Sequence, residues 1–278
     1  MKPKITNASI AKASIAKASI AAVLFSLVLI SIPAQDAAGM DGAAIIEMSR
    51  NRIQADTTSV RYRMIITARG GSTTELQMDQ YSKNDAQGNS RSVAVFGDPS
   101  PASVRGTRFL TLENSNRSND QWIFLPSLGR VRRIAATEGS GSFVGTDFSY
   151  DDIASADRRV DLDTHRLLRE ETLQGRACYV IESIPLETSY QYSRMIQWVD
   201  RENFVTHRVE LYDRRGSHVK TLEILELREV QGRLSPTITR MTTIAAGTST
   251  TLNVLNLRYD DNIPESVFTT NFLETGRP

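Results

Sequence analysis

The sequence predicts a mainly β protein, a single domain built on one highly curved antiparallel sheet that follows one helix. Three observations on the 278-residue chain indicate this fold class. From residue 59 onward, short segments with a period of two alternate with turn residues, at the spacing of a sandwich or barrel rather than of βαβ units. Two late segments change phase in mid-run, and one early segment has helical periodicity.

The early helix is expected to begin after Asp41, which is a suitable N-cap, and to reach about Ala55. Ile45, Met48 and Ile53 form its apolar stripe. The stripe needs an apolar partner, and the strands offer surplus apolar faces. We therefore expect this helix to pack on the concave face of the sheet.

The strands are placed by their alternation. Val60 and Tyr62 share one face of the first strand, and Leu76 continues the pattern in the next. Turn residues at 69–72 and 213–216 separate neighbouring strands. Further strands are expected at residues 90–96, 107–113, 166–172, 178–185, 194–200, 205–212, 219–230, 237–245 and 248–259.

Two of these strands change phase. Leu222 and Ile224 lie on one face, whereas Leu225 and Leu227 lie on the other, and residues 252–257 repeat the change. A one-residue slip turns every later side chain to the opposite face. Each change therefore indicates a β-bulge or a segment buried on both faces. Both alternatives favour a curved, covered sheet.

The stretch 120–150 is the most informative part of the chain. Its strand, WIFL at 122–125, is apolar on both faces, so we expect an element to cover each side. A loop at 137–152 follows, with three glycines and the aromatic residues Phe143, Phe148 and Tyr150. One interpretation is a lid whose rings plug a cavity when it is empty; the other is an ordinary surface loop after a doubly buried strand.

Composition narrows the function classes. A net charge of +1 argues against a nucleic-acid partner. The single cysteine, Cys178, lies in an apolar run and predicts a buried packing thiol. His165, His207 and His218 lack metal-ligand spacing, and no serine has a plausible base beside it. We therefore expect no enzyme site, no metal and no cofactor.

Residues 1–39 read as a secretory signal. Lys2, Lys4, Lys12 and Lys17 form a positive n-region before the apolar run 20–32, which is shorter than a membrane span of about 20 residues. Small residues allow cleavage after residue 34 or residue 39. Since no cysteine lies beside these cleavage points, we expect a soluble domain at 40–278 without a lipid anchor.

The segment DQWIFLPSLGRVRRI, followed by GSFVGTDFSYDDI, resembles the LolA-like family of outer-membrane lipoprotein-sorting proteins. The resemblance extends to GTRFLTLE at 106–113 and to IPESVFTTNFL at 263–273. It implies an incomplete β-barrel wrapped over helices, which holds lipid or an acylated protein in the periplasm. The implied partners are lipid or lipoprotein acyl chains, an inner-membrane transporter of the RND type and an outer-membrane acceptor, and the chain is expected to be monomeric.

On this reading a set of aromatic side chains forms the cavity wall, and arginines contact an anionic head group, because a guanidinium donates two parallel hydrogen bonds. The candidate ligand-binding residues are Trp122, Phe124, Arg130, Arg132, Arg133, Phe143, Phe148 and Tyr150. Arg133 is expected to share the side of Val131 and to face inward. The alternative for the arginines is a solvated strand edge.

A second function remains open, because related β-shell proteins resemble sigma-factor regulatory proteins. The chain would then be a periplasmic interaction or sensor module, or an accessory to an RND-type transporter, and would not carry lipid itself. Lipid that stays bound through gentle purification would separate the two readings.

Overall fold

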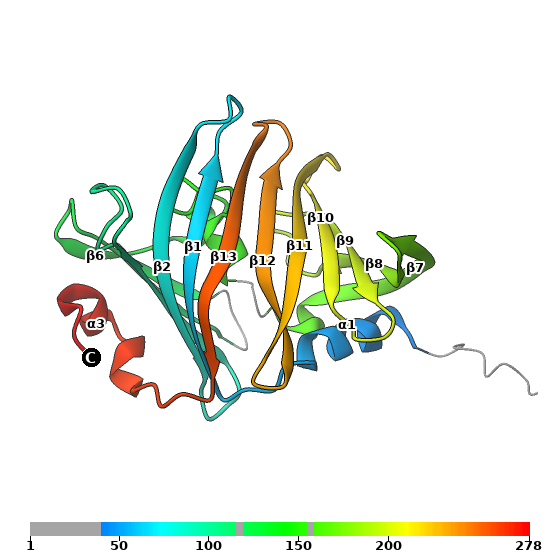
Figure 1. Ribbon diagram of the computed structural model, residues 1–278, viewed down its shortest axis with the longest axis horizontal. Helices are drawn as coiled ribbons and strands as arrows, with labels where there is room; N and C mark the ends of the chain where they lie inside the picture. The colour runs from blue at the N-terminus through cyan, green and yellow to red at the C-terminus, as the bar shows by residue number, and fades with distance from the viewer. Residues whose placement is uncertain (1–39, 115–118, 155–157) are drawn as a thin grey trace, which may run out of the picture. The chain divides into compact units, whose positions relative to one another are not determined.

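The computed structural model describes residues 40–114, 119–154 and 158–278, and residues 40–278 form one compact unit. Figure 1 shows one large curved sheet with short helices near its two ends. The expected signal at 1–39 lies outside the described residues. The strands are β1 (Thr57–Thr67), β2 (Thr73–Asn84), β3 (Ser90–Gly97), β4 (Arg108–Leu112), β5 (Asp120–Leu125), β6 (Arg130–Arg133), β7 (Asp163–Leu173), β8 (Arg176–Pro185), β9 (Arg194–Asp200), β10 (Thr206–Tyr212), β11 (His218–Val230), β12 (Arg233–Thr243) and β13 (Thr248–Tyr259).

The helical elements are short. They are α1 (Gly42–Asn51), α2 (Tyr150–Ala154) and α3 (Thr270–Thr275), with single 3-10 turns η1 (Ala136–Glu138), η2 (Val160–Leu162) and η3 (Glu265–Phe268). The expected early helix and its Asp41 cap are confirmed, since the Asp41 carboxylate accepts a hydrogen bond of 2.8 Å from the backbone N–H of Ala44. The helix ends at Asn51, four residues before the expected end.

The sheet runs in the order β6-β5-β4-β3-β2-β1-β13-β12-β11-β10-β9-β8-β7. Every described pairing between these strands is antiparallel. The pairing of β1 with β13 joins the two halves of the chain at the centre of the sheet. Strands β6 and β7 lie at opposite edges, so the barrel is incomplete, and the expected fold class is confirmed.

One face of the sheet carries the main hydrophobic cluster. Ile123 of β5 and Met195 of β9 belong to the same cluster, although these strands lie far apart in the sheet order. Strands can converge in this way only on the concave side, so this is the concave face. Helix α1 packs against β7 and β9 on the same face. Val199 belongs to the cluster that includes Ile45 of α1, and it lies on the same side of β9 as Met195, four residues earlier. The expected position of this helix is confirmed.

The C-terminal segment covers part of the convex face, which the sequence did not lead us to expect. Val267, Phe268 and Phe272 of η3 and α3 pack against Val93 and Leu110 in a second cluster. Figure 1 shows α3 beside the β6 end of the sheet. The doubly apolar strand β5 is thus covered on both sides, as its sequence requires.

The two phase changes correspond to register shifts in the ladders. One lies between Ile224 and Glu226 of β11, where Leu225 is the extra residue without a partner in β12. Another lies in β13, where Asn256 pairs with Arg61 and Val254 with Tyr62, so that Leu255 is the extra residue. The β-bulge reading is confirmed. Strand β12 begins earlier than expected, because Pro236 is accommodated within it, opposite Leu227.

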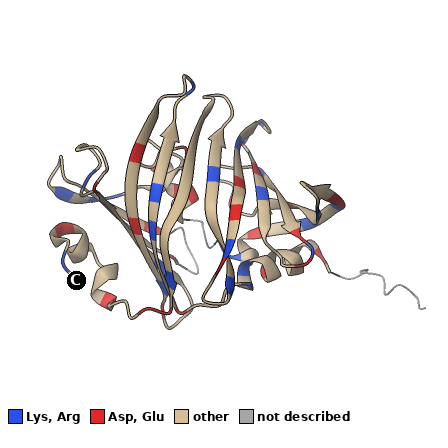
Figure 2. Cartoon of the chain, in the orientation of Figure 1, with Lys and Arg blue, Asp and Glu red and all other residues tan. Residues whose placement is uncertain are grey.

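Charges of both signs are interspersed along the strands, as Figure 2 shows. On the convex face Arg61 pairs with Asp79 at 2.6 Å, and Arg240 pairs with Glu223 at 2.9 Å. These pairs are partly exposed and contribute little to stability. No single-sign field gathers on this side of the described sheet.

Candidate functional site

Residues 139–152, which we call the plug, fill the concave face. The side chain of Phe143 is completely buried, and its ring centroid lies 5.1 Å from that of Phe109 and 5.6 Å from that of Phe96. Tyr150 adds an edge-on contact to Phe143 at 5.7 Å, and Phe148 is 6% exposed. The plug therefore supplies the aromatic centre of the main cluster.

The plug keeps its shape through a tight turn. Phe143 donates a backbone hydrogen bond of 2.8 Å to the carbonyl of Phe148, and the hydroxyl of Thr146 donates to the carbonyl of Phe143 at 2.7 Å. Val144 and Gly145 both have positive φ, 45° and 80°. A β-branched residue rarely adopts this conformation, so the packing of Val144 on the main cluster must offset the strain.

The glycines at 139 and 141 are required by close packing. A Cβ atom on Gly139 would overlap the Asp151 carboxylate, and a Cβ on Gly141 would lie 3.0 Å from the carbonyl oxygen of Glu138. The sequence suggested that these glycines make a flexible lid. In the structure Gly139 lets the two arms of the plug approach each other, and Gly141 fits closely over the preceding turn.

Asp147 holds one side of the plug. Its buried carboxylate accepts hydrogen bonds of 2.5 to 2.7 Å from the hydroxyls of Thr243, Thr248 and Thr250 at the β12–β13 turn. The Asp147 N–H also donates to the Thr250 hydroxyl oxygen at 2.9 Å. Hydrogen bonds to a charged acceptor are roughly twice as strong as neutral ones, so these contacts fix the plug to the sheet.

Asp152 holds the other side. Its carboxylate receives hydrogen bonds of 2.8 Å from the Lys220 ammonium and the Tyr192 hydroxyl, and one of 3.2 Å from the Gln191 amide. It also accepts the backbone N–H of Ser149 at 2.8 Å, while the Ser149 hydroxyl accepts the N–H of Asp152 at 3.0 Å, and these two bonds cap the start of α2. Burial, the charge of Asp152 and its hydrogen bond raise the pKa of Tyr192 far above its ordinary value, so this phenol stays a donor.

Asp151, the neighbour of Asp152, is less well satisfied. Burial raises the pKa of its carboxyl, and the charges of Asp152 and Glu187 raise it further, while a hydrogen bond from Gln121 opposes the shift. That bond is long, at 3.5 Å, and the Gln121 Oε1 atom is buried without a hydrogen-bond partner in the described structure. The plug therefore contains one carboxylate that is costly to keep charged.

The eight candidate residues do not line one cavity, which corrects the expectation. Trp122 and Phe124 lie on the convex face with Val131 and the C-terminal segment. Phe143, Phe148 and Tyr150 lie on the concave face. The sheet separates the two sets.

The arginines are divided in the same way. Arg133 is paired with Trp122 across the ladder, forms an ion pair with Asp120, and does share the side of Val131, but that side is convex. Arg132 lies opposite Ile123 on the concave side and binds Glu138 at 3.0 Å. The expectation that Arg133 faces inward is therefore wrong. Arg130 is exposed at the start of β6.

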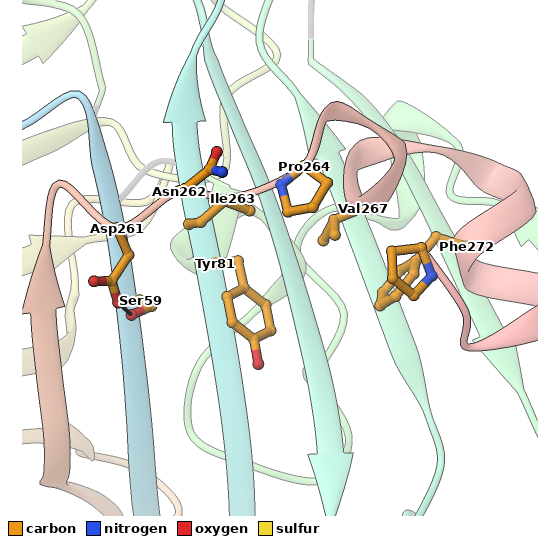
Figure 3. Close-up of a pocket in the computed structure, with 9 residues that line it drawn as sticks. Ser59, Tyr81, Asp261, Asn262, Ile263, Pro264, Val267 and Phe272 are labelled. Carbon is orange, nitrogen blue, oxygen red and sulfur yellow. Dashed lines mark hydrogen bonds between the residues drawn. The ribbon is translucent and has the colours of Figure 1, made fainter.

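A pocket lies on the convex face. It is a pocket of about 360 Å³ between β1–β2 and the C-terminal segment, shown in Figure 3. Tyr81, Ile263 and Phe272 give it apolar walls, and Ser59 donates a hydrogen bond of 3.0 Å to Asp261 at its rim. Sequence reasoning did not indicate this pocket.

Sequence reasoning did not indicate the polar residues that hold the plug either. The contacts of Asp152 with Lys220 and Tyr192 join segments far apart in the sequence. The one local signal was the Thr248–Thr250 repeat beside a tight turn. Cys178 is buried, as expected.

Two general features bear on the site. Within residues 40–114, 119–154 and 158–278, there is no group of three or more His, Cys, Asp or Glu side chains that is arranged to hold a metal ion. None of the described helices combines the length and the apolar character needed to cross a membrane.

Known proteins with similar sequences or structures add to this picture. A family model described as that of an uncharacterized protein matches residues 88–275. A search of curated proteins finds no match. Among solved structures, a DUF1329 family protein from Desulfovibrio piger is 29% identical with a TM-score of 0.79, and the match covers 84% of this chain and 97% of that one.

Two further structures are similar. A domain from Vibrio parahaemolyticus, described as an outer membrane lipoprotein-sorting protein, is 27% identical with a TM-score of 0.78, covering 84% of this chain and 98% of that one. A LolA superfamily protein from Nitrosomonas europaea is 22% identical with a TM-score of 0.67, covering 84% of this chain and all (100%) of that one, and it supports the fold alone.

Proposed function

Because the chain belongs to the LolA-like family of outer-membrane lipoprotein-sorting proteins, we propose that it is a periplasmic carrier or binding protein for acyl chains. The chains are those of lipids or of acylated lipoproteins. The proposed seat is the concave face of the sheet. The plug occupies that seat in the empty protein.

One observation carries the proposal. The main cluster is completed by a short segment of the chain rather than by a second sheet or a long helix. Burying an aromatic side chain stabilises by about 1.5–3 kcal/mol, and an acyl chain in the same place regains a similar amount. Replacing the plug's aromatic rings by an acyl chain therefore changes the free energy little. Binding is then reversible, as a carrier requires.

The plug is fixed by polar contacts at Asp147 and Asp152. Releasing one of them should open the seat. We propose Asp147→Asn, which keeps the shape of the side chain and removes the charge that orders Thr243, Thr248 and Thr250.

The test is the binding of a fluorescent long-chain fatty acid. Asp147→Asn should bind the probe faster than the parent protein. The matched control is Asp79→Asn, the same chemical change on the convex face, where the carboxylate contacts Arg61; it should bind the probe at the parent rate. Equal rates in all three proteins would show that the plug does not gate the seat, and a parent that binds no amphiphile would rule out the carrier function.

The proposed location follows from the same family membership and from the signal expected at 1–39. We expect fractionation of cells to place the processed chain in the periplasm. The apolar run at 20–32 carries no charge, and no cysteine lies beside the expected cleavage points, so we expect release without a lipid anchor. Recovery of the chain in a salt-washed membrane pellet would contradict this.

A second function is an interaction or sensor module that does not carry lipid. The observation that favours it is the full pairing of the Asp147 and Asp152 carboxylates, which leaves the concave face well filled without a ligand. Native mass spectrometry of gently purified protein separates the two: bound lipid supports the carrier, and a lipid-free protein that associates with an RND-type transporter supports the module. An outer-membrane acceptor is proposed for the carrier only.

A further inference from the structure

The groups that hold Asp152 come from a different part of the molecule than Asp152 itself. Lys220 lies on β11, and Gln191 and Tyr192 lie in the connection between β8 and β9. Asp152 is at the end of the plug. The Lys220 Nζ and Tyr192 hydroxyl atoms each lie 2.8 Å from a carboxylate oxygen of Asp152, and Gln191 Nε2 lies 3.2 Å away. If the plug moves, the donors stay with the sheet.

These donors are poorly exposed. The side chain of Lys220 is 16% exposed, that of Asp152 is 6% exposed, and Tyr192 is buried. A desolvated ammonium without a counter-ion is strongly unfavourable. Departure of Asp152 therefore leaves a site that requires a new anion.

We infer that Lys220, Tyr192 and Gln191 form a seat for the anionic head group of an amphiphile, a carboxylate or a phosphate. This inference rests on the proposed function, since it assigns the polar end of the ligand whose chain replaces Phe143 and Phe148. Asp152 imitates the head group, and the two rings imitate the chain. The plug thus acts as an internal substitute for the ligand.

The chemistry of the seat selects for charge. All three side chains present donors to the Asp152 oxygens, and one of them carries a positive charge. Ser149, whose hydroxyl oxygen accepts a hydrogen bond of 2.8 Å from Gln191, belongs to the plug and leaves with it, which frees this donor as well. A neutral ester would leave the Lys220 ammonium unpaired, and a cationic head group would be repelled.

The experiment compares a fluorescent fatty acid with its methyl ester, which has the same chain and no charge. The parent should prefer the acid. Lys220→Met should weaken binding of the acid on the order of tenfold, about 1.4 kcal/mol, because a hydrogen bond between two charged groups is lost. The same change should not weaken binding of the ester. Asp152→Asn, which removes the competing internal anion and keeps the cap of α2, should strengthen binding of the acid more than that of the ester.

Each other outcome overturns the inference in a distinguishable way. If the parent binds acid and ester equally, or if Lys220→Met affects both alike, the head-group seat is wrong and the acyl-chain carrier stands. If neither probe binds, the carrier function fails as well. Butyrate, which has the carboxylate but only a short chain, should not compete with the acid; equal competition by butyrate and dodecanoate would reveal a simple anion site.

Discussion

Gly139 packs so closely against Asp151 that a Cβ atom at position 139 would overlap the Asp151 carboxylate. The two residues lie on the opposed arms of the plug, and the Asp151 N–H donates to the Gly139 carbonyl at 2.9 Å. The φ of Gly139 is −55°, so its backbone conformation suits any residue. The need for glycine is therefore a matter of space, which makes the plug a packed element.

Gly139→Ala should destabilise the protein. Overpacking a filled site costs about 1–3 kcal/mol, and each kcal/mol lowers Tm by about 2–4 °C in a chain of this size. Thermal unfolding measures the effect. Gly70→Ala is the matched control, because nothing lies within 4 Å of the added methyl group there. Gly139→Ala/Asp151→Ala should recover part of the loss, and a double variant with purely additive losses would disprove the steric cause.

Asp151→Asn should stabilise the protein at neutral pH. Burial, aided by Asp152 and Glu187, raises the pKa of this carboxyl in the folded state. The penalty is absent below the ordinary carboxyl pKa, where folded and unfolded forms are both protonated, and it grows as pH rises through the raised value. The new amide can also donate to the unpaired Gln121 Oε1 atom.

Thermal unfolding of parent and variant between acidic and neutral pH tests the direction of this pH dependence. The variant should exceed the parent in Tm near neutral pH, and the difference should shrink in acid. Glu75→Gln is the control of opposite sign, because a hydrogen bond from Arg63 lowers the pKa of Glu75 and the exposed pair contributes little. A Tm advantage of Asp151→Asn that persists unchanged at low pH would contradict the titration argument.

Phe143→Ser/Phe148→Ser should remove the apolar centre of the plug. Truncating a buried phenylalanine costs about 3–5 kcal/mol, so a clear fall in Tm is expected together with altered affinity for a fluorescent fatty acid. Phe124→Ser is the control, because this ring lies under Arg108 on the convex face, 4.3 Å from its guanidinium carbon. It should lower Tm without changing probe affinity. Identical probe binding by parent and double variant would exclude the plug from the ligand seat.

Arg108→Met should loosen the C-terminal helix. The Arg108 guanidinium donates to the carbonyls of Leu273 at 2.6 Å and Glu274 at 3.2 Å, where α3 ends at Gly276 with φ 67°. Unpaired carbonyls at a helix end are stabilised by such donors, and their loss should cost about 1–2 kcal/mol. Hydrogen exchange at residues 270–276 should accelerate. Arg130→Met, at an exposed position on β6, should leave that exchange unchanged.

Local patterns determined much of the fold. Period-two alternation placed most strands, the Asp41 cap placed α1, and the phase changes at residues 224–227 and 254–257 located the bulges that curve the sheet. These signals depend on neighbours along the chain, so they can be read without tertiary contacts. The doubly apolar strand β5 also correctly required cover on both faces.

Only the tertiary structure decided which side of each strand lies on the concave face and which on the convex face. Alternation shows that Arg133 and Val131 share a side, and it does so correctly, but it cannot say whether that side is concave. The answer depends on how thirteen strands curve and where the plug and α3 dock. The same holds for Asp152 and Lys220, which are 68 residues apart and meet only because the plug crosses the concave face. Sequence therefore fixes which side chains lie together on a strand, and the curvature of the whole sheet fixes which of them can reach a ligand.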